Sequence, residues 1–179
     1  EMFGIYREDG LTDDDDGIYL HAAGEGQDIK LSRSVFAVGD DDGIDTLSAV
    51  VSIEDVIVRD FADKGISVYG GEATINRCLV AENNTNPEDP TVVSIGAKAH
   101  SGETTIVNMD HVTVVASEVA SPTVDIGIQS HNKTGETSGS IVWNVTDCII
   151  DATDPVDYQS PYRASDIHIS YSDLFDESW

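Results

Sequence analysis

Residues 39–61 read GDDDGIDTLSAVVSIEDVIVRDF, and this stretch decides how the chain folds. A run of aspartates around a glycine leads into two short segments of alternating apolar and polar residues, which a polar corner separates. Because side chains alternate along a strand, Ile44 and Thr46 are expected to point inward while Asp45 points outward. The stretch therefore predicts a coil of short strands that starts at an acidic turn.

The same strand-corner-strand pattern recurs along the sequence. It begins at six places, which are Ile29, Val51, Ala73, Thr105, Ile141 and Ile167. Most copies follow an acidic turn of the form D-x-G-I, which begins at Asp15, Asp41, Asp63 and Asp125 and has a degenerate copy at Val92. Short strands that recur with the same turn in the same phase are typical of a parallel β-helix. We expect an all-β, single-stranded right-handed parallel β-helix of about five to six coils.

The expected strands lie near 44–47, 51–53, 56–58, 66–69, 79–80, 112–115 and 141–150. One domain is expected to span residues 1–179, as a fragment or unit of a larger protein, because an uncapped solenoid end exposes strand edges. Self-assembly through these ends is a further expectation. Cys78 and Cys148 are expected at the same inward position with His111 in the coil between them. Their separation of roughly 10 Å exceeds disulfide reach, so they are expected to be core thiols.

The net charge of the chain limits the classes of partner that it can bind. It has 34 acidic residues against 9 basic ones and a formal net charge of −25. This balance argues against nucleic acid and anionic membrane surfaces and favours cations as partners. No segment approaches the roughly 20 apolar residues of a membrane span, so no membrane insertion is expected. The solvated surface of a salt-adapted organism is an alternative explanation for most of the acidity, and it stays open.

Stacking of coils would turn the acidic turns into a column, because equivalent residues in successive coils lie about 4.8 Å apart. The column is expected to contain Asp15, Asp16, Asp41, Asp42 and Asp63. Carboxylates this close need a counter-charge, and a hard cation held by oxygen ligands supplies one. Lys64, in the turn beside Asp63, is expected to neutralise part of the column rather than to act in catalysis.

The step from Asp16-Gly17-Ile18 in one coil to Asp41-Asp42-Gly43-Ile44-Asp45 in the next resembles the calcium site of the family 9 polysaccharide lyases, pectate lyases of β-helix fold. The match covers roughly residues 13 to 72. This resemblance implies a bound Ca²⁺ with Asp16, Asp41, Asp42 and Asp45 as its ligands. It also implies an acidic polysaccharide or cell-surface glycan as partner and a secreted or cell-surface location.

The sequence departs from this family at the catalytic base. The family carries a lysine in a G-F-K-L-G-G type strand, whereas GISVYGG at residues 65–71 places Ser67 at that position. The outward columns of the first strands are expected to be Tyr19, Asp45, Ser67, Gly96 and Gln129, and beside them His21, Leu47, Tyr69, Lys98 and His131. The second column offers a base and an acid for β-elimination. Candidate catalytic residues are Lys98, Tyr69 and His131, and candidate substrate-binding residues are Ser67 and Gln129.

Three functions stay open from the sequence. The chain could be a calcium-dependent polysaccharide-lyase-like enzyme, although Lys98 is expected two coils, or roughly 10 Å, from Asp45. It could be a module that binds an acidic polysaccharide without cleaving it, which the missing lysine favours. It could also be a non-catalytic structural or adhesin-type repeat of a secreted or surface protein.

Overall fold

The computed structural model describes residues 2–5, 16–21, 28–81, 83, 91–116, 124–133 and 139–175. These residues form seventeen strands and one 3-10 turn, Ala164–Asp166. Every strand pair that they form is parallel. They contain no helix of the length and apolar character needed to cross a membrane. The predicted all-β class with parallel strands is confirmed, and the arrangement is compatible with a parallel β-helix.

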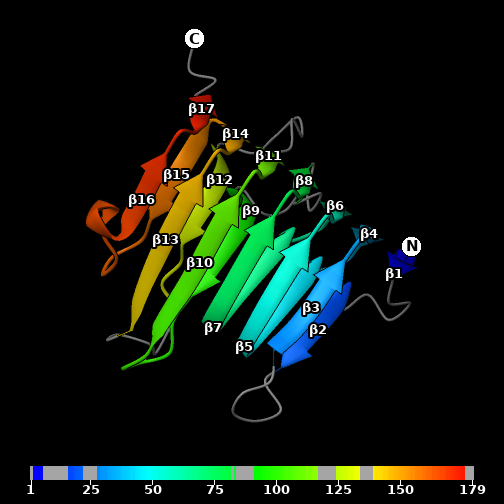
Figure 1. The fold of residues 1–179 in the computed structure, drawn as a ribbon, viewed down its shortest axis with the longest axis horizontal. Coiled ribbons are helices and arrows are strands. Elements are labelled where there is room, and N and C mark those ends of the chain that lie inside the picture. Colours follow the sequence, from blue (N-terminus) through cyan, green and yellow to red (C-terminus); the bar gives the residue numbers. More distant parts are fainter. Residues whose placement is uncertain are drawn as a thin grey trace.

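The chain passes repeatedly through three faces, and the equivalent strands of successive passes lie side by side from the blue to the red end of Figure 1. The first face contains β2 (Ile18–His21), the N-terminal halves of β5 (Ile44–Glu54) and β7 (Ile66–Asn76), β9 (Thr91–Lys98), β12 (Val124–Ser130) and β15 (Asp154–Tyr158). The second face contains β3 (Asp28–Ser32), the C-terminal halves of β5 and β7, β10 (Thr104–Asp110), β13 (Ser140–Thr146) and β16 (Ile167–Ser170). The third face contains β1 (Met2–Ile5), β4 (Val35–Gly39), β6 (Ile57–Phe61), β8 (Leu79–Ala81), β11 (Thr113–Val115), β14 (Ile149–Asp151) and β17 (Asp173–Phe175).

Strands β5 and β7 are long because each runs through the first and second faces without a break. The first half of β7 pairs with β9 and the second half with β10. Between the halves, Gly70 and Gly71 both have a φ of 75°, which favours glycine. A Cβ on Gly71 would also lie 2.2 Å from the carbonyl oxygen of Ala49. The segments predicted as separate strands at 44–47 and 51–53 are therefore parts of one bent strand.

The register of the first face confirms both predicted outward columns. Tyr19, Asp45, Ser67, Gly96 and Gln129 are aligned from strand to strand. His21, Leu47, Tyr69 and Lys98 are aligned beside them, and His131 directly follows the pair of Ala97 and Ser130. The inward residues form columns such as Ile44, Ile66, Ile95 and Ile128, all of them buried. Burial of each such side chain stabilises the fold by roughly 1.5–3 kcal/mol.

Each coil turns from the second to the third face at one residue with a left-handed backbone. These six residues, here called the corner column, have φ between 50° and 55° and are Arg33, Asp55, Arg77, His111, Asp147 and Tyr171. The N–H of Arg33 donates to the carbonyl oxygen of Glu54 in the next coil, and the same bond recurs at the following corners. This corner separates β13 from β14, so the single strand predicted at 141–150 is wrong.

The corner also corrects the predicted place of His111. This residue does not lie in the inward column between the two cysteines, because Asp110 is aligned with Asn76 and Thr146, which places His111 level with the corner residues Arg77 and Asp147. Val112 occupies the inward position, since β11 pairs with β8 on one side and β14 on the other. His111 is exposed at the corner. Cys78 and Cys148 are free thiols on either side of the coil that contains Val112. Both are buried in the core, as predicted.

The core columns remain open at the C-terminal coil. Leu174 continues the column of the buried Ile150 and is 42% exposed, and Ile169 continues the column of the buried Val145 and is 37% exposed. Both side chains are exposed because no described coil covers them. The last described coil therefore presents apolar core positions and strand edges together.

Candidate functional site

The D-x-G-I turns, which lead from the third face to the first, stack directly on one another. The N–H of Gly17 donates to the carbonyl oxygen of Asp42, and the N–H of Gly43 donates to that of Lys64, each at 2.8 Å. A Cβ on Gly43 would lie 2.7 Å from the carbonyl oxygen of Gly65. Close packing between coils therefore requires glycine here and holds the neighbouring aspartates at a fixed spacing.

This stacking brings aspartates of two coils together. Carboxylate oxygens of Asp16, Asp42 and Asp45 lie within 4.8 Å of one another, and we call these residues the pocket group. Asp41, Asp42 and Asp63 converge in the same way, and we call them the turn group. The predicted quartet is thus divided into two groups that share Asp42, with Asp41 in the second. Asp15, also expected in the column, lies outside the described residues.

Lys64 supplies positive charge to the turn group. It is only 6% exposed, its amino group forms an ion pair with Asp63, and the same group lies 3.6 Å from Oδ1 of Asp42. Its backbone N–H donates to that oxygen at 2.9 Å. Burial alone would lower the pKa of Lys64, but Asp42 and Asp63 outweigh burial and raise it. The neutralising contact predicted for Lys64 is present.

The pKa values of the pocket group are raised, and burial is the largest cause. It raises the pKa of Asp16 to about 7, and Asp45 and Asp42 add to the effect. Burial also raises the pKa of Asp42 to about 6, although Lys64 opposes it. The pKa of Asp45 is raised by burial as well. Near neutral pH the pocket group therefore favours a bound proton or a cation over three bare carboxylates.

Ser67 lies beside Asp45 in the first outward column and is 1% exposed. Its hydroxyl lowers the pKa of Asp45, yet its oxygen makes no hydrogen bond of normal geometry. The hydroxyl is therefore close to the carboxylate without being fully satisfied by it. At this depth Ser67 is adjacent to the pocket group but is not accessible from the surface.

Lys98 is opposite Tyr69 in the second outward column. Its backbone lies two coils from Asp45, as predicted, but its charge lowers the pKa of both Asp42 and Asp45. In return, burial and then Lys64 lower the pKa of Lys98, against the influence of the aspartates. Lys98 is half-buried, and a lysine with a lowered pKa is the type of group that serves as a general base.

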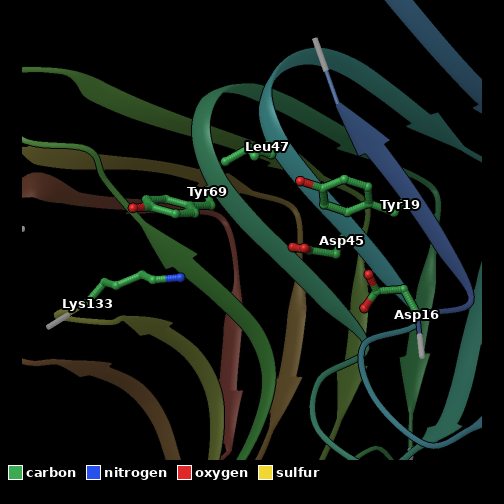
Figure 2. Close-up of a pocket in the computed structure, with 6 residues that line it drawn as sticks. All are labelled: Asp16, Tyr19, Asp45, Leu47, Tyr69 and Lys133. Carbon is green, nitrogen blue, oxygen red and sulfur yellow. The ribbon is translucent and has the colours of Figure 1, made fainter. Parts of the chain in front are cut away.

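A pocket of about 450 Å³ opens beside the pocket group on the first face. It is lined by Asp16, Tyr19, Asp45, Leu47, Tyr69 and Lys133. Figure 2 shows the Asp45 carboxylate and the Lys133 amino group pointing into the space between them. Of the residues predicted for the site, Asp16, Asp45 and Tyr69 line this pocket, whereas Lys98, Gln129 and His131 do not.

Tyr69 has two close partners at the side of the pocket opposite the aspartates. Its ring stacks on the ring of His100, with centroids 4.0 Å apart and an interplanar angle of 26°. The amino group of Lys133 lies 4.7 Å from the centroid of the Tyr69 ring, within cation–π range. The pocket thus has a carboxylate end at Asp16 and Asp45 and a cationic, aromatic end at Lys133 and Tyr69.

Gln129 and His131 are engaged within the protein. The Gln129 amide donates to Asp157 at 2.7 Å and lies 3.1 Å from Nδ1 of His131 through its oxygen. Burial, followed by Lys98 and Lys64, lowers the pKa of His131. Gln129 is buried, so it is not exposed for substrate binding in this conformation, while the half-buried His131 keeps a neutral ring near pH 7.

Sequence reasoning missed Lys133 and His100. Both follow the end of a first-face strand, where no register can be predicted, and neither was part of a predicted column. The signal for Lys133 was weak but present, because alternation from Gln129 and His131 would place it on the same side. His100 had the same kind of signal, two residues after Lys98. A Cβ on Gly70 would lie 3.0 Å from Cδ2 of His100, so the glycine leaves room for this ring.

A third group of metal-ligating type lies on the opposite side of the coil, where Asp110, His111 and Asp147 converge at the corner column. Nδ1 of His111 lies 2.8 Å from Oδ1 of Asp110, whose other oxygen accepts a hydrogen bond from Asn76. His111 and Asp147 are exposed, and His111 already pairs with Asp110. The group therefore lacks the burial that distinguishes the pocket group.

No family model matches the sequence, and comparisons with curated proteins and with solved structures give no significant match either. The resemblance to the family 9 polysaccharide lyases therefore rests on the two acidic turn motifs alone, and what it implies is taken up as a proposal.

Proposed function

We propose that this chain is a right-handed parallel β-helix that binds Ca²⁺ at the pocket group and holds an acidic polysaccharide in the adjoining pocket. The observation that carries the proposal is the convergence of three carboxylates from two stacked coils at one end of that pocket. The right hand follows from the strong general preference for right-handed crossovers between parallel strands. A secreted or cell-surface location belongs to the same proposal, since such glycans are found there.

Calcium suits the pocket group better than magnesium does. Ca²⁺ takes six to eight oxygen ligands in flexible geometry, whereas Mg²⁺ demands a near-ideal octahedron and retains its waters. Asp16, Asp42 and Asp45 offer three carboxylates in an irregular arrangement that spans two coils. Asp41, which the sequence placed among the ligands, is held in the turn group and would influence the ion through its charge.

At about 450 Å³ the pocket lies within the roughly 300–1,000 Å³ that is typical of ligand pockets, so we expect it to hold a short segment of an anionic polysaccharide. A sugar carboxylate could lie between the calcium ion and Lys133. Tyr19 and Tyr69 offer aromatic rings to the sugar. Neutral glycans would lack the carboxylate that both ends of the pocket address, so we expect selectivity for uronate polymers.

Cleavage by β-elimination is the second candidate, and the lowered pKa of the half-buried Lys98 favours it. A neutral Lys98 would remove the proton beside the uronate carboxylate, the electron pair would form a carbon–carbon double bond, and the glycosidic C–O bond would break. The departing oxygen would take a proton from the Tyr69 hydroxyl. Calcium would stabilise the negative charge that develops on the carboxylate.

The structural alternative is a repeat that uses calcium for stiffness, within a longer protein or a self-assembled fibre. The exposed core positions Ile169 and Leu174 support end-to-end association, because another coil would cover them. This alternative predicts calcium binding without glycan binding, so the two are separable.

Calorimetric titration of the wild-type protein with CaCl₂ in moderate salt tests the metal site. We expect one saturable site, and titration with KCl in its place should give none. If the acidity only reflects salt adaptation, calcium heats will be weak and unsaturable, and the calcium proposal fails.

Binding to polygalacturonate tests the glycan site, with calcium held saturating. Tyr69→Ala and Lys133→Ala should each weaken binding at least about tenfold, in keeping with losses at aromatic and charged hot spots. Tyr171→Ala and Lys30→Ala, which change the same residue types far from the pocket, are the matched controls. A rise in ultraviolet absorbance from unsaturated product would establish cleavage, and its loss in Lys98→Ala would assign the base.

A further inference from the structure

We propose that Lys64 is a built-in cation that occupies the turn group, so that the acidic cluster binds one calcium ion rather than two. The inference rests on the proposed calcium site but concerns a different residue. It makes Lys64 a determinant of how many ions bind, and nothing in the resemblance to the lyases assigns it that role.

The position of Lys64 in the stack is the first argument. Ile18, Ile44 and Ile66 are aligned, so the residues two places before them occupy one column. That column therefore reads Asp16, Asp42 and Lys64. The third coil places an ammonium group where continuation of the repeat would have placed a third carboxylate.

The contacts of Lys64 are the second argument. Its amino group pairs with Asp63 and lies 3.6 Å from Oδ1 of Asp42, and its backbone N–H donates to the same oxygen. Two of the three carboxylates of the turn group are thus bound to one buried residue. A buried ammonium needs such partners, since burial without them is costly.

The space around the lysine is the third argument. A Cβ on Gly96 would lie 2.9 Å from Cδ of Lys64. Gly96 stands in the first outward column, where the other described strands carry side chains such as Asp45 and Gln129. The absent side chain leaves room for the lysine stem, which lies across this position and directs the ammonium into the turn group.

A divalent ion in the turn group would have to displace this ammonium or lie against it. The chain holds the ammonium in place, so it acts at a high effective concentration and does not leave with dilution. The pocket group shares only Asp42 with Lys64, and its other members, Asp16 and Asp45, make no ion pair with the lysine among the described contacts. One calcium site therefore remains, on the side of the pocket.

The test counts bound calcium ions in wild type, Lys64→Met and Lys30→Met, by calorimetry and by metal analysis after dialysis at saturating calcium. Lys64→Met keeps the apolar stem and removes the charge, while Lys30→Met removes the same charge from an exposed ion pair with Glu54. We expect one ion in wild type and in Lys30→Met and two in Lys64→Met. The double variant Lys64→Met/Asp63→Asn should return to one.

A single ion in both wild type and Lys64→Met would overturn the inference. If this variant folds only with calcium, circular dichroism in a calcium series will show it, and restored folding with two bound ions supports the inference. Misfolding that calcium does not repair counts against it, because a turn group without its ammonium should accept the free ion. Failure of the proposed function looks different, since wild type would then bind no calcium. In that case one ion in Lys64→Met still supports the role of Lys64.

Discussion

The corner column and the D-x-G-I turns each connect two faces of a coil, yet they treat charge in opposite ways. At the corner, Arg77 donates to Asp55 of the preceding coil through Nε and Nη2, at 2.7 and 3.0 Å. Both side chains are about half exposed. At the D-x-G-I turns, Asp42 stacks on Asp16 from the neighbouring coil and is almost completely buried.

The pKa shifts follow this difference. The Arg77 guanidinium lowers the pKa of Asp55, so the corner stabilises its carboxylate in the charged form. Burial raises the pKa of Asp16 and Asp42, so the turns destabilise theirs. The same stacking of coils thus gives a self-neutralised column at one edge and a surplus of buried acid at the other. A surplus of this kind is where a cation gains most from binding.

The most direct test of this difference is to remove one carboxylate from each edge and compare the calcium affinities. Asp42→Asn should weaken calcium binding by more than about 100-fold, since even the partners of metal ligands are worth about 10–100-fold. Asp55→Asn removes the same charge from the corner and should leave affinity nearly unchanged. Calorimetric titration measures both. Equal losses would mean that only the total charge of the chain attracts calcium.

Removal of calcium should have the next largest effect, on thermal stability. Calcium at 100 times its dissociation constant adds about 2.7 kcal/mol to the free energy of unfolding, which for a chain of this length corresponds to roughly 5–10 °C in Tm. Chelation should remove this gain, and NaCl or KCl at matched ionic strength should not restore it. Restoration by KCl would favour diffuse, salt-adapted acidity over a site at the turns.

The two edges should also differ in the sign of their pH dependence. The raised pKa of Asp16, about 7, means that the metal-free folded state holds a proton that the unfolded chain releases near its ordinary value of 3.8. Stability should therefore fall as pH rises from about 4 to about 7, and Asp16→Asn should flatten this slope. Urea unfolding of the metal-free protein across this range measures the slope.

The lowered pKa of Asp55 acts in the opposite direction, because its contribution is present above the ordinary pKa and lost as pH falls through the lowered one. Asp55→Asn should thus change only the acidic limb of the same curve. With saturating calcium the Asp16 slope should shrink, because the ion replaces the proton. A slope that Asp16→Asn leaves intact would assign the titration to other groups.

The smallest effect is expected at the corner itself. Arg77→Gln should lower Tm by roughly a degree or two, because exposed ion pairs contribute little and salt screens them. The loss should shrink further in 1 M NaCl. Thermal melts at low and high salt measure it, with Arg59→Gln as a second exposed control. A large decrease in Tm that salt does not reduce would show that the charges at the corner are buried in the way that those at the D-x-G-I turns are.

Much of the first face could be predicted because strand alternation fixes which residues stack. One register places Asp45 beside Ser67 and Tyr69 beside Lys98, and the repeated D-x-G-I motif supplies that register directly. The convergence of Asp16, Asp42 and Asp45 follows from the same rule, since each lies at a defined place relative to an aligned isoleucine.

The errors arose where the backbone leaves the strand geometry. The polar corner was aligned one residue out of register in one coil, because alternation alone does not show which of two adjacent polar residues is the left-handed one, and His111 therefore lies at the exposed corner instead of in the core. The division of the aspartates into two groups also depends on side-chain detail, because Lys64 is held by Asp63 and Asp42 inside the turn. Lys133 lines the pocket from beyond the end of β12, so its place could be predicted only by extending the alternation of Gln129 and His131 past the strand.

The corner column offers regularly spaced labelling sites for measuring distances along the stack of coils. Its residues adopt left-handed φ values with side chains as different as arginine, aspartate, histidine and tyrosine, so the backbone there does not depend on which side chain is present. The native thiols Cys78 and Cys148 are buried. A cysteine introduced at Arg33, His111 or Tyr171 would therefore be the readily labelled thiol, at known multiples of about 4.8 Å along the stack. Spin labels at such pairs would report the rise of each coil and its change when the acidic edge is loaded.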